Sequence, residues 1–203
     1  MSNETKDHFK HKASNYENDS NRVNNVSNIG NKILSEISYS KDMHIMDFGA
    51  GTGMLLSQVA PYVNKITAID VSRSMIETLT KKKDNIKCLL EIKEIDLSKE
   101  NLDAKFDGII SSMTMHHIKE IKEMLEKFYN MLSSNGTIAL SDLDKEDGTF
   151  HQEDTGVYHL GFDRNEFMNI TKEVGFKNLK IHTVGNVIKP YGEYPVFLLT
   201  GNK

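Results

Sequence analysis

The sequence predicts an α/β protein with a doubly wound, seven-stranded, mostly parallel sheet and one antiparallel strand that closes it. Between residues 43 and 143, short apolar runs alternate with segments whose apolar residues recur every three or four positions. This pattern is typical of buried strands that alternate with helices. The last two apolar runs, 177–184 and 194–200, are joined by a loop too short for a crossover helix, which indicates an antiparallel pair.

Each predicted element has a local signal. Apolar residues at 23, 26, 29, 33, 34 and 37 share one face of a helix over residues 22–39. Ser72 and Asp163 are suited to cap the helices that follow them. We assign residues 1–39 to an N-terminal helical lid or cap segment and 40–203 to one α/β domain. Residues 1–21 are polar, and both a lid and a disordered tail fit them. The remaining expected strands are 43–48, 65–70, a segment within 86–95, 106–112 and 136–143, and the remaining helices are 52–63, 72–83, 118–132 and 163–174.

Composition limits the functional classes. The 203 residues carry a net charge of −4, with a pI of about 6.1, so we expect no nucleic-acid partner. No apolar run is long enough to span a membrane. The single cysteine, Cys88, excludes an intrachain disulfide and favours a reducing, cytoplasmic compartment. The sequence does not indicate an oligomeric state.

A glycine-rich turn follows the first predicted strand, in the pattern D-x-G-x-G-x-G that begins at Asp47. Glycines in such a turn let a ligand approach the backbone, and the amides of the next helix then face that ligand. The dinucleotide fingerprint G-x-G-x-x-G does not fit, because Met54 and Leu56 stand where its last glycine would be. The turn therefore predicts a cofactor other than a dinucleotide.

At this motif the sequence resembles the class I S-adenosylmethionine (SAM)-dependent methyltransferases. Later segments keep the family's order: an acid ends the second strand, another follows the third, and an aromatic–Asp pair, Phe106-Asp107, opens the fourth. The segment 131–138 resembles the family's helix–turn–strand, with Asn135-Gly136 in its turn. The resemblance covers about residues 40–200. Within the family, the sequence is broadly similar to the ubiquinone/menaquinone C-methylating enzymes. It implies a Rossmann-like fold, SAM as cofactor and methyl transfer.

The resemblance also implies the cofactor contacts. Asp70 would accept the ribose hydroxyls, Asp96 the adenine amino group, and Tyr16 would lie over SAM. The expected cofactor-binding residues are Asp47, Gly49, Ala50, Gly51, Gly53, Asp70, Val71, Ile95, Asp96, Ser112 and Tyr16.

The acceptor side is less defined. Methyltransferases that act on the amino groups of adenine or cytosine carry the motif [D/N/S]-P-P-[Y/F] after the fourth strand, and this sequence lacks it. It also lacks the cysteine that cytosine C5 methylation needs at this place. We therefore expect a small-molecule acceptor. His117 and His116 are the candidate catalytic residues, because histidine is the natural base near neutral pH. Met113, Tyr158 and His159 are the expected acceptor pocket. No metal is expected, since the histidines and acids after 142 show no recurring ligand spacing.

Two other functions remain open from the sequence. A non-catalytic SAM-binding protein would share every cofactor residue. An NAD-dependent oxidoreductase would share the sheet, but the missing glycine at Met54 and the antiparallel closing pair count against it.

Overall fold

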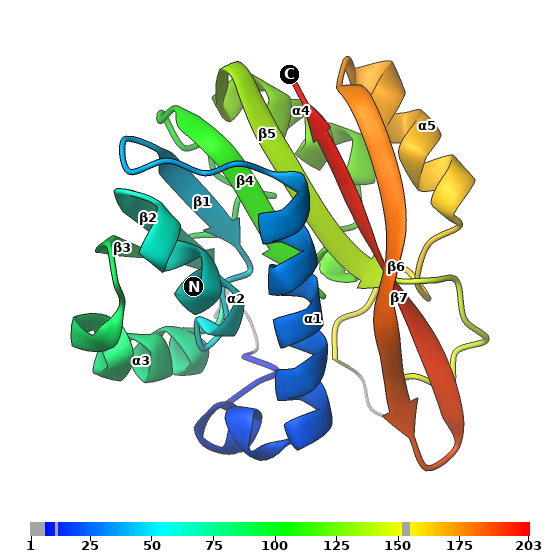
Figure 1. Cartoon of the computed structure of the whole chain (residues 1–203). Helices are drawn as coiled ribbons and strands as arrows, with labels where there is room; N and C mark the ends of the chain where they lie inside the picture. Colours follow the sequence, from blue (N-terminus) through cyan, green and yellow to red (C-terminus); the bar gives the residue numbers. More distant parts are fainter. Residues whose placement is uncertain (1–6, 11, 152–154) are drawn as a thin grey trace, which may run out of the picture.

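The computed structural model describes residues 7–10, 12–151 and 155–203. Its centre is a seven-stranded sheet in the order β3-β2-β1-β4-β5-β7-β6 (Figure 1). β7 is antiparallel to both of its neighbours, and the other neighbouring pairs are parallel. The predicted fold class is confirmed. The strands are β1 (His44–Phe48), β2 (Lys65–Asp70), β3 (Leu89–Glu94), β4 (Phe106–Ser112), β5 (Leu132–Leu143), β6 (Lys177–Lys189) and β7 (Gly192–Asn202).

Helices cover both faces of the sheet and create two hydrophobic layers. Ile45 and Met46 are both fully buried and point to opposite faces, because side chains alternate along a strand. Ile45 packs in the layer that includes α1, α2 and α3, and Met46 in the layer that includes α4 and α5. The helices are α1 (Ser20–Glu36), α2 (Met54–Val59), α3 (Arg73–Lys82), α4 (Ile121–Met131) and α5 (Arg164–Val174).

The first helix is built into the core. Asp19 caps α1 by accepting the amide N–H groups of Asn21 and Arg22. The apolar face predicted from the spacing is buried at Val26, Ile29 and Ile33, where α1 packs against α2 and β6. Residues 20–36 therefore belong to the hydrophobic core of the sheet domain.

The described part of the segment before α1 lies near the carboxyl ends of the strands, where Asp7 contacts Ser72 after β2. It contains the 3-10 helix η1 (Ala13–Asn18), which contacts α1 and α3. Figure 1 shows this segment, in deep blue, beside the ends of those helices. The lid predicted for residues 1–21 falls partly on residues 1–6 and 11, which lie outside the described residues.

The closing hairpin is longer than predicted. The antiparallel pairing is confirmed, but the expected loop holding Gly185, Pro190 and Gly192 is mostly strand. β6 runs on to Lys189, with a register shift between Thr183 and Gly185. Glycine suggested a loop at 185, whereas the structure uses it, at φ 157°, in extended strand.

The strand order places a switch point beside β1. From β1 the chain crosses to β2 on one side and later returns to β4 on the other, so Phe48 pairs with both Ile69 and Ser111. Ligands of open α/β sheets bind in the crevice outside the carboxyl ends of the strands at such a point. The glycine turn after β1 and the loop after β4 border this crevice.

Candidate cofactor and acceptor site

The glycine turn needs left-handed backbone at three positions. Gly49, Gly51 and Gly53 have φ angles of 70°, 55° and 87°, which residues with a Cβ rarely adopt. The amides of Gly49 and Ala50 both donate to the carbonyl of Ile69, at 2.8 and 3.0 Å. The turn is thereby fastened to the last residues of β2.

Gly51 faces open space. A Cβ built at Gly51 would meet no atom within 4 Å, counting the described residues. A Cβ at Gly49 would collide with the Thr114 side chain, and one at Gly53 with Leu79. The three glycines therefore have different roles. Gly49 and Gly53 permit close packing within the protein, whereas Gly51 leaves space through which a ligand can approach the backbone.

Asp70 joins this turn to the next loop. Its Oδ2 accepts the Gly51 amide at 2.7 Å and its Oδ1 accepts the Ser72 amide at 2.8 Å. Burial raises the pKa of the Asp70 carboxyl, and these backbone donors oppose that rise. Each carboxylate oxygen can accept a further hydrogen bond, so the group is still able to take two neighbouring hydroxyls.

Asp47 is a buried acid beneath the turn. It is 1% exposed, and among the described residues its Oδ2 has no hydrogen-bond partner. Burial, and then the nearby charge of Asp70, raise its pKa to about 8. A positively charged ligand group placed nearby would stabilise the ionised carboxylate, and SAM carries both an ammonium and a sulfonium. The open face of Gly51 and the acids on either side of it therefore fit SAM.

The residues expected around adenine lie along the same edge. Ile95 donates its amide to the carbonyl of Asp70, and Val71 is 55% exposed. Asp96 accepts the Ser98 amide and pairs with Lys99 at 2.7 Å. These bonds describe a surface turn, and the adenine role of Asp96 stays a prediction.

The described part of the N-terminal segment contacts the loop after β2 and the start of α3. Asp7 accepts hydrogen bonds from the Ser72 hydroxyl at 2.8 Å and the Ser74 amide at 3.1 Å. The guanidinium of Arg22 lies 4.1 Å from the centre of the Tyr16 ring and donates to the Tyr16 carbonyl. Burial raises the pKa of the Tyr16 hydroxyl, whereas the charge of Arg22 lowers it. The charge of Asp70 also raises this pKa, so Tyr16 lies within electrostatic range of the acid that holds the glycine turn.

A pair of buried groups lies on the other side of the crevice. Nδ1 of His116 is 2.7 Å from Oδ1 of Asp142, and the His116 amide donates to Oδ2 at 3.1 Å. His116 is 2% exposed and Asp142 is 1% exposed. Asp142 lies near the end of β5, while His116 lies in the 3-10 helix η4 (Met115–His117) after β4.

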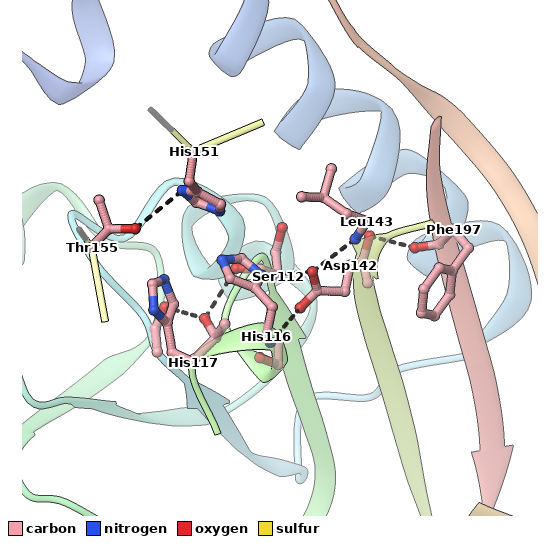
Figure 2. Close-up of polar contacts among 12 residues, drawn as sticks. Ser112, His116, His117, Asp142, Leu143, His151, Thr155 and Phe197 are labelled. Carbon is pink, nitrogen blue, oxygen red and sulfur yellow. Dashed lines mark hydrogen bonds and ion pairs between the residues drawn. The ribbon is translucent and has the colours of Figure 1, made fainter. Parts of the chain in front are cut away.

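Two more histidines complete a cluster with this pair (Figure 2). The His117 ring centroid is 4.3 Å from that of His116, and the His151 ring is 5.2 Å from His116 and 6.2 Å from His117. Burial, and then the neighbouring His116, lower the pKa of His117 to about 4. Burial and then His116 and His117 likewise lower the pKa of His151 to about 4.

The described residues supply no set of metal ligands at this cluster. Across residues 7–10, 12–151 and 155–203, no three His, Cys, Asp or Glu side chains are arranged to hold a metal ion. Nδ1 of His117 instead donates to the Gly156 carbonyl at 3.2 Å, and Nδ1 of His151 is 3.1 Å from the Thr155 hydroxyl. The two imidazole rings are therefore held by different hydrogen-bond partners, although they lie close to each other.

The other residues expected in the acceptor pocket are divided. Met113 lies at the end of β4 with φ 57°, a strained value for a side chain of its size, and it packs on the layer that contains α1. Beside Met113, Ser112 is a residue expected to bind the cofactor, and its buried hydroxyl has no partner among the described residues. Tyr158, however, is 62% exposed. The half-buried His159 donates from its ring to the Ile118 carbonyl at 2.9 Å.

Several site residues were not singled out from the sequence. The sequence places His151 among the loop histidines and Asp142 among the acids near it, but it favours His116 and His117 for catalysis. Asp142 nevertheless follows the same rule as Asp47 and Asp70, an acid near the carboxyl end of a strand. That rule could have selected it. Asp7 and Phe9 have no comparable signal, because their contacts to Ser72 and His117 depend on how the chain folds back.

Comparison with known proteins identifies the family of the domain. Residues 46–138 match the family model described as a methyltransferase domain. An uncharacterized methyltransferase of Schizosaccharomyces pombe is 32% identical over 156 residues, 68% of this chain and 55% of that protein. Malonyl-[acyl-carrier protein] O-methyltransferase of Bacillus anthracis is 31% identical over 139 residues, 67% of this chain and 48% of that protein. The chain thus spans about half the length of these curated relatives.

A solved structure shows the same fold with a cofactor product. Haemonchus contortus phosphoethanolamine N-methyltransferase 2, in complex with phosphomonomethylethanolamine and S-adenosylhomocysteine, superposes with a TM-score of 0.72 at 12% identity, covering 97% of this chain and 59% of that one. The fold, the glycine turn and the family match define a class I SAM-dependent methyltransferase domain, and its cofactor is SAM. None of the helices in the described parts of the chain is long and apolar enough to cross a membrane.

Proposed function

We propose that this protein transfers the methyl group of SAM to a small-molecule acceptor. The observation that carries the proposal is the glycine turn after β1, where Gly51 faces open space and its amide is held by Asp70. SAM supplies a methyl group that is already activated on a sulfonium. The protein needs to hold an acceptor in line with that methyl group and exclude water.

The cofactor side of this proposal uses two acids. Asp70 would accept the ribose hydroxyls with the lone pairs that remain beside its bonds to Gly51 and Ser72. Asp47, whose Oδ2 lacks a partner among the described residues, would face the positive charge of SAM. Tyr16 and the other described residues before α1, 7–10 and 12–19, would cover the cofactor and keep water out.

The contact between the N-terminal segment and the histidine cluster supports a small acceptor. Phe9 packs edge-on to His117 with ring centroids 6.0 Å apart, so the N-terminal segment reaches the histidine cluster. An acceptor would have to fit beneath this segment. The names of relatives do not choose among acceptors, since they include an acyl-carrier-protein O-methyltransferase and a ribosomal RNA methyltransferase. The net charge of −4 favours a small molecule over RNA.

Calorimetry and product detection test the proposal. We expect SAM and S-adenosylhomocysteine to bind in the micromolar range or tighter and NAD not to compete. S-adenosylhomocysteine release would then be measured with a panel of thiols, phenols, amines and quinol-like compounds. Failure of SAM to bind would contradict the proposal. Binding without turnover of any acceptor would favour a non-catalytic SAM-binding protein.

A further inference from the structure

We propose that His116, oriented by Asp142, is the general base of the reaction, and that the acceptor carries a dissociable proton on the atom that is methylated. This inference rests on the proposed methyl transfer and adds the chemical class of the acceptor: a hydroxyl, a thiol or an activated C–H group. His117 and His151 line the acceptor side of the same space as neutral hydrogen-bonding groups.

The first step of the argument is the tautomer of His116. A carboxylate only accepts hydrogen bonds, so Nδ1 of His116 donates to Oδ1 of Asp142 across their 2.7 Å separation. The lone pair of the neutral ring then lies on Nε2. The His116 amide and the Leu143 amide also donate to the Asp142 carboxylate, which fixes its position. Asp142 is therefore a positioning residue that sets which nitrogen can receive a proton.

The second step separates His116 from the other two imidazoles. His117 and His151 have no carboxylate hydrogen-bonded to their rings among the described residues; a carbonyl and a hydroxyl serve them instead. Burial holds the pKa of each at about 4, so both stay neutral at pH 7 and are poor proton acceptors. Of these three rings, only that of His116 is hydrogen-bonded to a carboxylate of the described residues, the buried Asp142.

The third step is the position of the cluster relative to the cofactor turn. The Thr114 hydroxyl is 3.4 Å from the Gly49 carbonyl, and its side chain occupies the space where a Cβ of Gly49 would be. His116 is two residues further on, at the same edge of the sheet. Figure 2 shows the His151 ring directed toward His116 and His117. The Nε2 atom of His151 is buried and has no partner among the described residues, so a polar group of the acceptor would satisfy it.

The chemical step balances. The X–H bond of the acceptor breaks and its proton goes to Nε2 of His116, while the electron pair on X forms the new X–C bond. The S–C bond breaks and its electrons stay on sulfur, leaving S-adenosylhomocysteine. The positive charge moves from sulfur to the His116–Asp142 pair and then to water with the released proton. An acceptor without a proton would make this pair unnecessary.

The first test reads the tautomer without any acceptor. Long-range ¹H–¹⁵N spectra of the imidazoles would be recorded on the S-adenosylhomocysteine complex between pH 5 and 9. We expect the neutral His116 ring to carry its proton on Nδ1, and Asp142→Asn to shift it toward Nε2. A wild-type His116 protonated on Nε2, or an unchanged spectrum in Asp142→Asn, would overturn the proposal. His182→Gln, a change on β6, is the control for spectral assignment.

The second test separates base catalysis from folding. Phenol keeps its proton at pH 8, whereas 4-nitrophenol is largely ionised and needs little help from a base. We expect His116→Gln and Asp142→Asn to slow methylation of phenol about 10²-fold or more, and that of 4-nitrophenol only a few-fold. Equal losses with both phenols would indicate a structural role. If wild type methylates neither phenol, the tautomer measurement decides.

Loss of SAM binding in calorimetry identifies failure of the proposed function itself. Thermal unfolding of each variant shows whether it folds. His116→Gln keeps the proposal testable if Asp142→Asn does not fold.

Discussion

Oδ2 of Asp70 lies 2.7 Å from the amide nitrogen of Gly51 and accepts its hydrogen, so the acid that ends β2 holds the glycine turn that follows β1. Oδ1 of the same carboxylate accepts the Ser72 amide at the start of α3. One side chain thus positions two loops of the crevice. Any ligand that bonds to Asp70 becomes linked to the geometry of both.

Removing this carboxylate should weaken cofactor binding. We expect Asp70→Ala to cost about 1.5–3 kcal/mol of SAM binding, roughly 10- to 150-fold in Kd, because hydrogen bonds to a charged group are lost. Isothermal titration calorimetry measures the change. Asp103→Ala, at an exposed aspartate, is the matched control. An Asp70→Ala variant within twofold of wild type would place the ribose elsewhere.

The open face of Gly51 makes a second prediction. Gly51→Val should abolish SAM binding, because its side chain fills the approach path that no described residue occupies. A valine also strains this left-handed backbone, so Gly148→Val, at φ 91° in the loop after β5, controls for strain. We expect the control to bind SAM normally. Similar titration curves for Gly51→Val and wild type would show that the cofactor lies elsewhere.

The N-terminal segment should slow cofactor release. Asp7→Ala removes the acceptor of the Ser72 hydroxyl and Ser74 amide bonds, and it should raise the dissociation rate of S-adenosylhomocysteine about three- to tenfold. Stopped-flow displacement measures this rate. Asn18→Ala, which removes a bond confined to η1, should leave it unchanged. Equal rates in wild type and Asp7→Ala would argue against a covering role.

Binding of SAM should release a proton through Asp47. With a pKa of about 8, this carboxyl is mostly protonated at pH 7 in the free protein. A nearby positive charge lowers that pKa, so the group ionises on binding and SAM affinity should rise from pH 6 to pH 8. Calorimetry in buffers with different ionisation enthalpies should detect up to about one proton per SAM. Asp47→Asn should remove this dependence, and a wild type without proton release would contradict it.

His117 should make the fold less stable in acid. Its pKa falls from 6.5 to about 4 on folding, so between these values the unfolded chain binds more protons and stability drops as the pH falls. The loss is at most about 1.4 kcal/mol per pH unit. Urea unfolding at pH 4, 5, 6 and 7 would show a steeper decline for wild type than for His117→Gln. Parallel curves would mean that His117 titrates alike in both states.

Local patterns carried most of the fold prediction. β2 and β4 have the predicted bounds, because each is a short apolar run between clear boundaries. α4 begins three residues late, at Ile121, since Ile118 is extended and ends η4. Helical spacing continues through residue 118, but spacing alone does not show where the backbone leaves the helix.

The cofactor turn can be predicted from the sequence because its residues are contiguous. The acceptor side cannot, because its residues come from distant parts of the chain. His116 and Asp142 are 26 residues apart, and neither spacing nor composition shows that they meet. Position alone ranked His117 with His116; the carboxylate contact separates them. Tyr158 was placed in the pocket by its position after β5, but the backbone bond from its amide to His116 leaves its side chain exposed.

β7 lies between β5 and β6, although it follows both of them in the chain. β6 therefore has no place in the sheet until β7 has paired with both neighbours. On the ribosome, a nascent chain that has released β6 still lacks the strand to which β6 must pair. Final closure of the sheet must wait until residues 192–202 have left the exit tunnel, and until then the edge of β5 is open to chaperones and proteases.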